Sequence, residues 1–408
     1  TNVSSFFVGS GTNLGGEGST SGDITFQGTT HTLDVNALTS AALGSTGAGT
    51  LDVSAIGTGG FTVNVSGVAS DITVLTYGSG GFTGDLNAFT LGSNTTGSRG
   101  FGGFTNDVTN SAIKVDLGYA DNTWTGAASS NWDLNNTANW NNSSDSLFFE
   151  LDDATFGDTA SNFTATLVED ITASRVTFEN NTNDYSLGSD NGSRVLTSNN
   201  GFDFTGSGDV TVNVELSGAA GLTQSGTGTT TLSSTNSYTG TTTIGNGTIV
   251  ANAANAFGTS GNITFTGGTL QFAENGATAD YGARIKNSTG IILDSNGQNV
   301  TLSGSLDNSN SGGLTKNGTG QLTITEARNY TGTTTVNEGT LTLRGAAIGT
   351  SKSYGPIANG AILEFDSTGN TANGGTITLT GSGTFKKSGT NQFNITSAGS
   401  NVDQSSGG

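Results

Sequence analysis

Short runs in which apolar and polar residues alternate recur along the whole chain. Residues 60–65 read Gly-Phe-Thr-Val-Asn-Val, and residues 261–266 read Gly-Asn-Ile-Thr-Phe-Thr. Such alternation is typical of a β-strand with one buried face, and Thr on the other face suits a pleated sheet. No useful stretch shows the spacing of an amphipathic helix. The pattern predicts an ordered all-β protein with short strands.

Turn signals separate these runs at short intervals. Asn-Gly pairs, which tolerate a positive φ, occur at residues 191–192, 246–247, 275–276, 296–297, 317–318, 359–360 and 373–374. Strands connected by turns alone form a sandwich, a barrel or a coil.

An internal repeat favours the coil. Residues 221–228, Gly-Leu-Thr-Gln-Ser-Gly-Thr-Gly, recur at residues 313–320 as Gly-Leu-Thr-Lys-Asn-Gly-Thr-Gly. The segments that begin at Tyr238 and Tyr330 also match, and a decayed third copy spans residues 383–396. The matching blocks keep one offset, 92 residues, as between 221 and 313 or 238 and 330. Stacked repeats bury a continuous core that no single copy could bury, so we expect an elongated β-solenoid.

These blocks resemble the passenger-associated repeat of autotransporters. That repeat has the form Gly-x-Leu-Thr-Lys-x-Gly-x-Gly, then Asn-x-Tyr-Thr-Gly-x-Thr-x-Val, then Gly-x-Leu. Residues 313–341 carry it nearly whole, including Lys316, and residues 221–249 carry it with Gln224 in the Lys position. The resemblance implies a right-handed parallel β-helix displayed outside a Gram-negative-type bacterium. We expect Tyr238 and Tyr330 to be aromatics that brace a corner, with a ligand role as the alternative.

All the tryptophans, Trp124, Trp132 and Trp140, lie close together in the sequence. The segment looks like the Trp-x-Gly…Trp…Asn-Trp segment of large exported repeat proteins. Exposed indoles could stack on sugar rings, which would make a glycan-binding site. The alternative, which we favour, is a local hydrophobic cluster at a junction, because Phe residues follow at positions 148, 149 and 156.

The same landmarks divide the chain. We expect an N-terminal β-rich section at residues 1–118, itself a solenoid, a Trp-rich junction at 119–160, and a β-helix at 161–408. The first residues carry no signal peptide, so we expect a mature product or a segment of a longer exported protein.

Composition narrows the functional classes. The chain has 408 residues, no Cys, and a net charge of −20 from 12 basic and 32 acidic side chains. Nucleic-acid binding needs Lys and Arg clusters, which are missing. No apolar run is long enough for a membrane span, so we expect no membrane insertion in this segment. Without Cys there is no disulfide framework or thiolate site.

Candidate catalytic groups are few. His31, near Asp34, is the lone histidine, and we expect it to be an ordinary turn or surface residue. Asp152, Asp153 and Asp158 could serve a polysaccharide-processing site, yet no basic residue is near them in sequence.

The sequence evidence for a metal site is equally weak. Residues 145–158 and 180–184 are rich in oxygen ligands for Ca²⁺, but neither follows the EF-hand spacing or the Gly-rich nonapeptide pattern. We expect no cofactor, with Ca²⁺ as the alternative, and solvated turns explain both segments more simply.

Our leading hypothesis is a non-enzymatic, extracellular structural protein: a β-helical surface passenger or a self-assembling fibre subunit. Because the ends of a solenoid carry unpaired backbone groups, head-to-tail self-association is an expected partnership. An adhesin or glycan-binding module that contacts cell-surface glycans through Trp124, Trp132 and Trp140 is the alternative. A carbohydrate-active β-helix enzyme is the third.

Overall fold

The computed structural model describes residues 5–8, 12–15, 19–36, 43–66, 71–94, 103–116, 118–142, 146–348, 353–358, 360–368, 376–389, 394–398 and 401–403. Asp145, Asn373 and part of the third repeat copy lie outside the described residues. The described chain consists of β-strands and four short 3₁₀ turns. It divides into two compact units. Unit 1 comprises 1–122, 134–136 and 142–153, and unit 2 comprises 123–133, 137–141 and 154–408.

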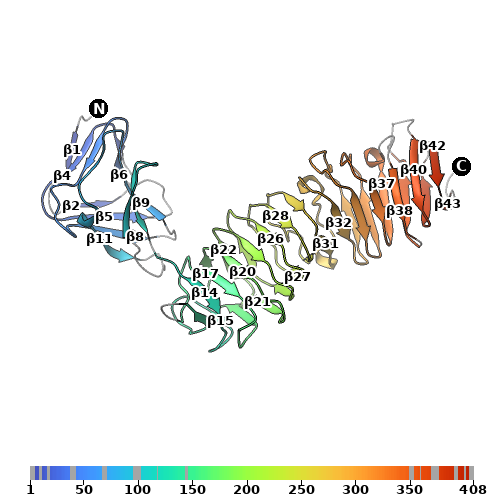
Figure 1. Ribbon diagram of the computed structural model, residues 1–408, viewed down its shortest axis with the longest axis horizontal. Helices are drawn as coiled ribbons and strands as arrows, with labels where there is room; N and C mark the ends of the chain where they lie inside the picture. Colours follow the sequence, from blue (N-terminus) through green and yellow to red (C-terminus); the bar gives the residue numbers. More distant parts are fainter. Residues whose placement is uncertain are drawn as a thin grey trace. The chain divides into compact units, whose positions relative to one another are not determined.

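Unit 1 is a short three-sided parallel solenoid (Figure 1). Its chain visits three sheets in turn, and equivalent strands of successive coils pair in parallel, as Leu33 does with Val63. The first sheet contains β1 (Ser5–Val8), β4 (Asp23–Phe26), β7 (Thr50–Asp52) and β10 (Gly81–Thr83). The second contains β2 (Thr12–Gly15), β5 (His31–Asn36), β8 (Phe61–Ser66) and β11 (Phe89–Asn94). The third contains β3 (Ser19–Thr20), β6 (Leu43–Ser45), β9 (Asp71–Thr76) and the antiparallel hairpin of β12 (Gly103–Asp107) and β13 (Ala112–Asp116).

Unit 2 is a longer solenoid of the same kind, and its four sheets run along it (Figure 1). The eight-stranded sheet contains β16 (Trp140–Asn141), β14 (Asp121–Trp124), β17 (Asp153–Phe156), β20 (Val176–Phe178), β23 (Phe202–Phe204), β26 (Leu222–Gln224), β28 (Thr242–Ile244) and β30 (Ile263–Phe265). The three-stranded sheet contains β19 (Ile171–Ala173), β22 (Val195–Ser198) and β25 (Glu215–Ser217).

The other two sheets continue into the C-terminal half of unit 2. The thirteen-stranded sheet contains β15 (Asn131–Trp132), β18 (Thr164–Leu167), β21 (Tyr185–Ser189), β24 (Val210–Val212), β27 (Thr229–Leu232), β29 (Thr248–Ala251), β31 (Thr269–Phe272), β32 (Ile291–Asp294), β34 (Leu314–Asn317), β36 (Thr334–Val336), β38 (Ser353–Ile357), β40 (Thr376–Gly381) and β42 (Asn394–Ala398). The six-stranded sheet contains β33 (Asn299–Leu302), β35 (Gln321–Ile324), β37 (Thr340–Arg344), β39 (Ile362–Asp366), β41 (Thr384–Ser388) and β43 (Asn401–Asp403).

The alternating sequence pattern produces one narrow interior. Most strands of unit 2 place every second side chain inward, and in-register pairing stacks those side chains in rows. Phe156, Phe178 and Phe204 form such a row, with ring centroids 4.5 and 5.2 Å apart. Each fully buried side chain of this size contributes about 1.5–3 kcal/mol to folding. The all-β, parallel solenoid expected from the sequence is confirmed.

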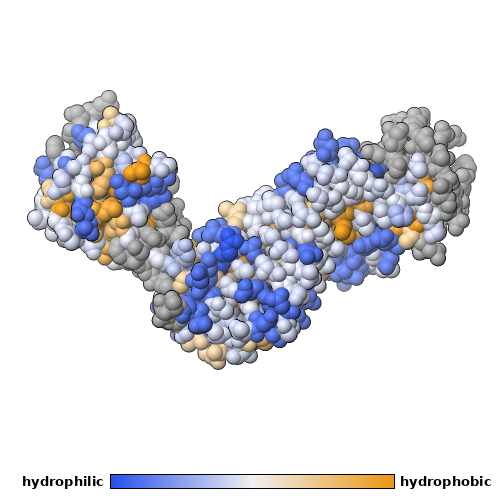
Figure 2. All heavy atoms as spheres, viewed as in Figure 1, coloured by the Kyte–Doolittle hydropathy of each residue, from blue (hydrophilic) through white to orange (hydrophobic). Residues whose placement is uncertain are grey.

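The outer surface of unit 2 is mostly of intermediate hydropathy with hydrophilic patches (Figure 2). This is what outward Thr, Ser and Asn side chains produce, because the apolar residues of each strand are used inside. Among the described residues of the whole chain, the large hydrophobic side chains that are well exposed are Val108 and Tyr119.

The two sequence repeats occupy different faces of the solenoid. In the first copy, β26 and β28 belong to the eight-stranded sheet and β27 and β29 to the thirteen-stranded sheet. In the second copy, the matching strands β34 and β36 lie in the thirteen-stranded sheet, and β35 and β37 lie in the six-stranded sheet. The second copy is therefore shifted by one face.

The shift arises between β31 and β32. Residues 273–290 join these strands and contain the 3₁₀ turns η2 (Glu274–Gly276) and η3 (Gly282–Arg284). On this passage the chain forms an isolated β-bridge with the eight-stranded face, between Ile263 and Ile285, in place of a strand, and β32 then pairs with β31. The longer connection lets the next apolar strand settle one face further along the coil.

Candidate functional site

The tryptophan cluster lies in the interior of unit 2. Trp124, Trp132 and Trp140 are 0%, 0% and 2% exposed. Trp140 contacts both other indoles at 5.1 Å between centroids, and Phe156 contacts all three at 5.4–5.8 Å. Trp124 Nε1 donates a 2.7 Å hydrogen bond to the carbonyl oxygen of Asn162.

A glycan site built on exposed tryptophans is therefore wrong for this structure. Stacking on sugar needs an open indole face, and here the faces pack against one another and against Phe156. The local hydrophobic cluster that we favoured from the sequence is what the structure contains. Trp124 pairs antiparallel with Trp140, whereas the strands of this sheet from β17 onward pair in parallel, and the cluster lies against the first aromatic row of the unit 2 core at Phe156.

The variable Lys or Gln of the repeat is a buried corner clamp. Lys316 is 0% exposed, and its amine donates to the carbonyl oxygens of Asn317, Gly318 and Glu338 at 2.9, 2.7 and 3.2 Å. Burial lowers the pKa of Lys316 to about 8, while Asp294 and Glu338 act in the opposite direction. The amine thus adds hydrogen bonds to carbonyl groups of the tight turn and of the next coil; one of them, that of Asn317, also accepts from the N–H of Ser295.

Gln224 performs the same task in the first copy. Its Nε2 donates to the carbonyl oxygens of Gly226 and Gly228, both at 3.1 Å. Its Oε1 needs a donor of its own and accepts a 2.6 Å hydrogen bond from Thr230. In the second copy, Leu322 takes the position of Thr230, which is consistent with Lys having no acceptor to satisfy.

The two repeat tyrosines have equivalent surroundings. Tyr238 and Tyr330 are 0% and 1% exposed, and each hydroxyl hydrogen-bonds the Thr four residues on, Thr242 or Thr334, at 2.7 and 2.6 Å. Burial raises the pKa of Tyr238. The structure places both rings at interior corners, closed to any ligand from solvent.

A second clamp, two residues before each Tyr, was missed in the sequence. Asn236 donates to the carbonyl oxygen of Ala256 at 2.6 Å, and Arg328 donates to those of Ala347 and Ile348 at 2.6 and 3.0 Å. Asn236 and Arg328 are separated by the repeat offset, as are Ala256 and Ile348. The repeat offset could have revealed that Asn236 and Arg328 occupy equivalent positions. Because Asn and Arg are chemically unlike, the equivalence becomes clear only in the structure, where both cap the next coil.

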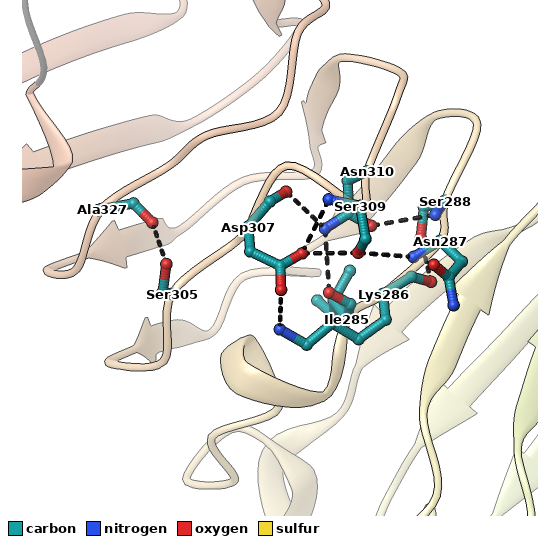
Figure 3. Close-up of polar contacts among 9 residues, drawn as sticks. All are labelled: Ile285, Lys286, Asn287, Ser288, Ser305, Asp307, Ser309, Asn310 and Ala327. Atoms are coloured by element: carbon teal, nitrogen blue, oxygen red, sulfur yellow. Dashed lines mark hydrogen bonds and ion pairs between the residues drawn. The ribbon is translucent and has the colours of Figure 1, made fainter.

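Between the two copies, side chains also bridge neighbouring coils directly (Figure 3). Buried Asn310 accepts from the backbone N–H of Ser288 at 3.1 Å and donates to the carbonyl oxygen of Ile285 at 3.0 Å. Lys286 pairs with Asp307 at the edge of this network. Here the regular backbone ladder is interrupted, and an amide side chain replaces it.

Two of the candidate catalytic carboxylates, Asp152 and Asp158, are engaged by the backbone. Buried Asp152 accepts from the N–H groups of Ala120 and Phe149 and from the Asn122 amide, at 2.6–3.0 Å. Asp158 accepts from three successive backbone N–H groups of residues 181–183, at 2.9–3.1 Å, and these bonds lower its pKa. Asp153 lies at the start of β17. These contacts fix turns.

The candidate calcium segment at residues 180–184 turns its N–H groups toward Asp158, a polarity suited to an anion. Within the described residues, no three His, Cys, Asp or Glu side chains gather closely enough to hold a metal ion. Ca²⁺ binding stays a prediction. The same residues contain no helix with the length and apolar character needed to cross a membrane.

His31 is not at the surface, contrary to the sequence-based expectation. It is 2% exposed, faces the core of unit 1 from the first position of β5, and lies 5.2 Å from the Phe26 ring and 5.8 Å from the Phe61 ring. Among the described residues, neither ring nitrogen has a hydrogen-bond partner of normal geometry. His31 takes the inward position that Phe61 takes in the next coil, so the alternation of β5 placed it inside.

Comparison with known proteins agrees with this architecture. The family model described as the passenger-associated-transport-repeat matches residues 222–251 and 314–343, the two segments whose clamps and tyrosines are described above. The chain is thus a β-solenoid that carries the repeat of autotransporter passengers. It is also 31% identical over 162 residues, 36% of its length, to the adhesin BmaC autotransporter of Brucella suis biovar 1 (strain 1330). The matched segment covers 5% of that much longer protein. No solved structure matched the chain significantly.

Proposed function

We propose that this chain is part of a surface-displayed, non-enzymatic passenger that acts in adhesion at the surface of a Gram-negative-type bacterium. Its solenoid supplies a rigid scaffold with an extended polar surface. The relative that is named an adhesin supports the adhesive role, and the passenger repeats support surface display.

One observation carries the proposal. The signature side chains of the repeat, from Leu314 and Lys316 to Tyr330, Thr334 and Leu341, all point inward. The matching residues of the first copy do the same, namely Leu222, Gln224, Tyr238, Thr242 and Ile249. What the repeat preserves is therefore the construction of a coil: its inward residues, its corner glycines, and outward Thr residues such as Thr223 and Thr315. This is the pattern expected of a scaffold whose contacts spread over a surface.

Adhesion of the purified 408-residue chain tests the proposal. Beads coated with the chain should adhere to cultured host cells, and excess soluble chain should compete. Beads coated with serum albumin are the control. Adhesion no greater than that of albumin beads would contradict the adhesive role.

The enzymatic alternative has a separate test. We expect the chain to release no product from a panel of acidic and neutral polysaccharides. Turnover that disappears in Asp152→Asn would overturn the non-enzymatic assignment. A loss of folding in that variant, seen by circular dichroism, must be checked, because Asp152 holds three donors.

A further inference from the structure

A shallow hollow of about 390 Å³ lies on the outer face of the six-stranded sheet of unit 2. Asn299, Gln321, Thr340 and Ile362 line it from four neighbouring strands, β33, β35, β37 and β39. These residues are direct partners in the parallel register, so they form one row that runs across the strands. Glu364 and Lys386 form the next row.

Glycine keeps one side of the hollow open. Gly320 and Gly339 stand at the corners before β35 and β37, with φ of 90° and 61°. A Cβ at Gly339 would lie 2.4 Å from the carbonyl oxygen of Gly320, and one at Gly320 would lie 2.4 Å from that of Gln298. Side chains are therefore excluded from both corners by the backbone itself.

The lining is polar but without net charge. Lys386 and Glu364 pair at 3.1 Å, and Glu364 also accepts from Ser388 at 2.9 Å and from Thr342 at 3.2 Å. Gln321 donates to Thr342 at 2.7 Å, which orients its amide. Within the described part of the chain, no protein group bonds the Asn299 amide, the Gln321 carbonyl oxygen or the Thr340 hydroxyl, so these groups can face a ligand.

We propose that this hollow binds a neutral oligosaccharide laid along the solenoid axis, an inference that rests on the proposed adhesive function and names its ligand class. Adjacent strands lie about 4.8 Å apart, which is close to the rise of one sugar unit in an extended glycan. Successive sugars would then meet Asn299, Gln321, Thr340 and Ile362 in turn. Amide and hydroxyl groups match sugar hydroxyls, and Ile362 offers an apolar contact to a ring face.

Charge and topology argue against other occupants. An anionic glycan or nucleic acid would find its cation, Lys386, already paired, on a chain with a net charge of −20. A peptide strand would need free backbone groups, but β35, β37 and β39 are paired on both sides within the sheet.

The test uses the full chain on an array of neutral, sialylated and sulfated oligosaccharides, followed by titration calorimetry with the strongest neutral glycan. Gln321→Ala removes an amide from the hollow, and Thr340→Trp fills it. We expect Gln321→Ala to weaken binding roughly tenfold, as loss of one or two hydrogen bonds does. Thr340→Trp should abolish binding.

Gln271→Ala is the matched control. Gln271 is an outward Gln on β31 that bonds the next strand through Asp294 at 2.9 Å, but it belongs to another sheet. Its loss should leave glycan binding unchanged. Melting temperatures of all three variants should stay close to that of the parent, because the changed side chains lie on the outside.

Each outcome of these binding experiments either supports or overturns the inference. Neutral-glycan binding that falls in both hollow variants and survives in Gln271→Ala supports the inference. Binding that is unchanged in the hollow variants, or confined to charged glycans, overturns it. If no oligosaccharide on the array binds but the coated beads adhere to cells, the inference is overturned and the proposed adhesive function stands. If no oligosaccharide binds and the beads do not adhere, both the inference and the proposed function are contradicted.

Discussion

Buried polar side chains at the corners distinguish the two repeat copies more than any apolar residue does. Lys316 needs only acceptors, so its neighbour can be Leu322. Gln224 brings an acceptor as well, and Thr230 satisfies it. The clamp and its neighbour therefore form a coupled pair in each copy.

This coupling predicts the result of a double-mutant cycle at positions 316 and 322. Lys316→Gln alone should destabilise unit 2 because the new Oε1 is buried without a donor. Leu322→Thr alone should destabilise it because a hydroxyl replaces packing. The double variant should be more stable than the two single effects predict, by about 1 kcal/mol. Denaturant unfolding measures the cycle, and strict additivity would contradict the coupling.

Lys316 also predicts a pH dependence of stability. Its folded pKa, about 8, is lower than the ordinary value of 10.5. Between these values the unfolded chain binds more protons, so stability should rise with pH through that window. Lys316→Gln should lack this rise. Unfolding at several pH values, compared between parent and variant, isolates this contribution from those of other groups.

His31 predicts the acid response of unit 1. Burial lowers its pKa below 6.5, against a smaller opposite effect from the Gln27 backbone. The unfolded state therefore takes up more protons as the pH falls below 6.5, and unit 1 should lose stability. His31→Phe, which extends the aromatic row with Phe61, should remove this loss.

Hydrogen exchange of peptides from residues 24–89, in parent and variant, measures the acid effect. All the tryptophans belong to unit 2, so their fluorescence reports whether that unit stays folded. Equal acid sensitivity of parent and His31→Phe would show that another group is responsible.

At the scale of elements, alternation was sufficient to predict strands. Runs such as residues 60–65 and 261–266 became β8 and β30 because each has one apolar face to bury. The same alternation rule predicts an inward position for His31, at the start of β5. The surface position was expected instead because the side chain is polar. The tryptophan segment could not be settled from sequence, since burial depends on which surfaces fold over Trp140.

The tryptophan cluster should be a structural element that unit 2 needs. Trp140→Ala removes a ring that touches two indoles and Phe156, and should cost about 3–5 kcal/mol. Thr211→Ala, on the outer face of β24, is the control and should change stability by less than about 0.5 kcal/mol. Chemical unfolding followed by circular dichroism compares the two. A Trp140→Ala variant of unchanged stability would contradict the packing role.

At the scale of the whole molecule, the repeat offset indicated a solenoid because only stacked coils give both copies similar surroundings. The shift of the second copy by one face could not be predicted. Residues 273–290 are defined as a longer connection only by the ends of β31 and β32 in the structure, and the choice of β31 as the partner of β32 depends on tertiary packing. The hollow on the six-stranded sheet depends on that pairing, so it could not be predicted from the sequence either.

Stacking predicts which deletions the chain tolerates. Removing residues 242–262 deletes one full coil and brings Leu222 into register with Ile263, since both pair with Thr242 and its equivalents in one row. The shortened chain should fold and unfold cooperatively. Removing only residues 242–251 takes away β28, β29 and the corner between them but keeps the rest of that coil, residues 252–262, and should abolish the fold of the neighbouring coils. Limited proteolysis separates the outcomes, and equal resistance of both deletions would contradict a stacked arrangement.

The displacement of the second repeat by one face has a consequence for how such chains diversify. When a block equal to a whole number of coils plus one face is copied, the new copy keeps its interior but points its outward residues in a new direction. Duplication alone then places the same outward side chains next to different surface residues. A lineage could thereby acquire a novel exterior before a single outward residue mutates.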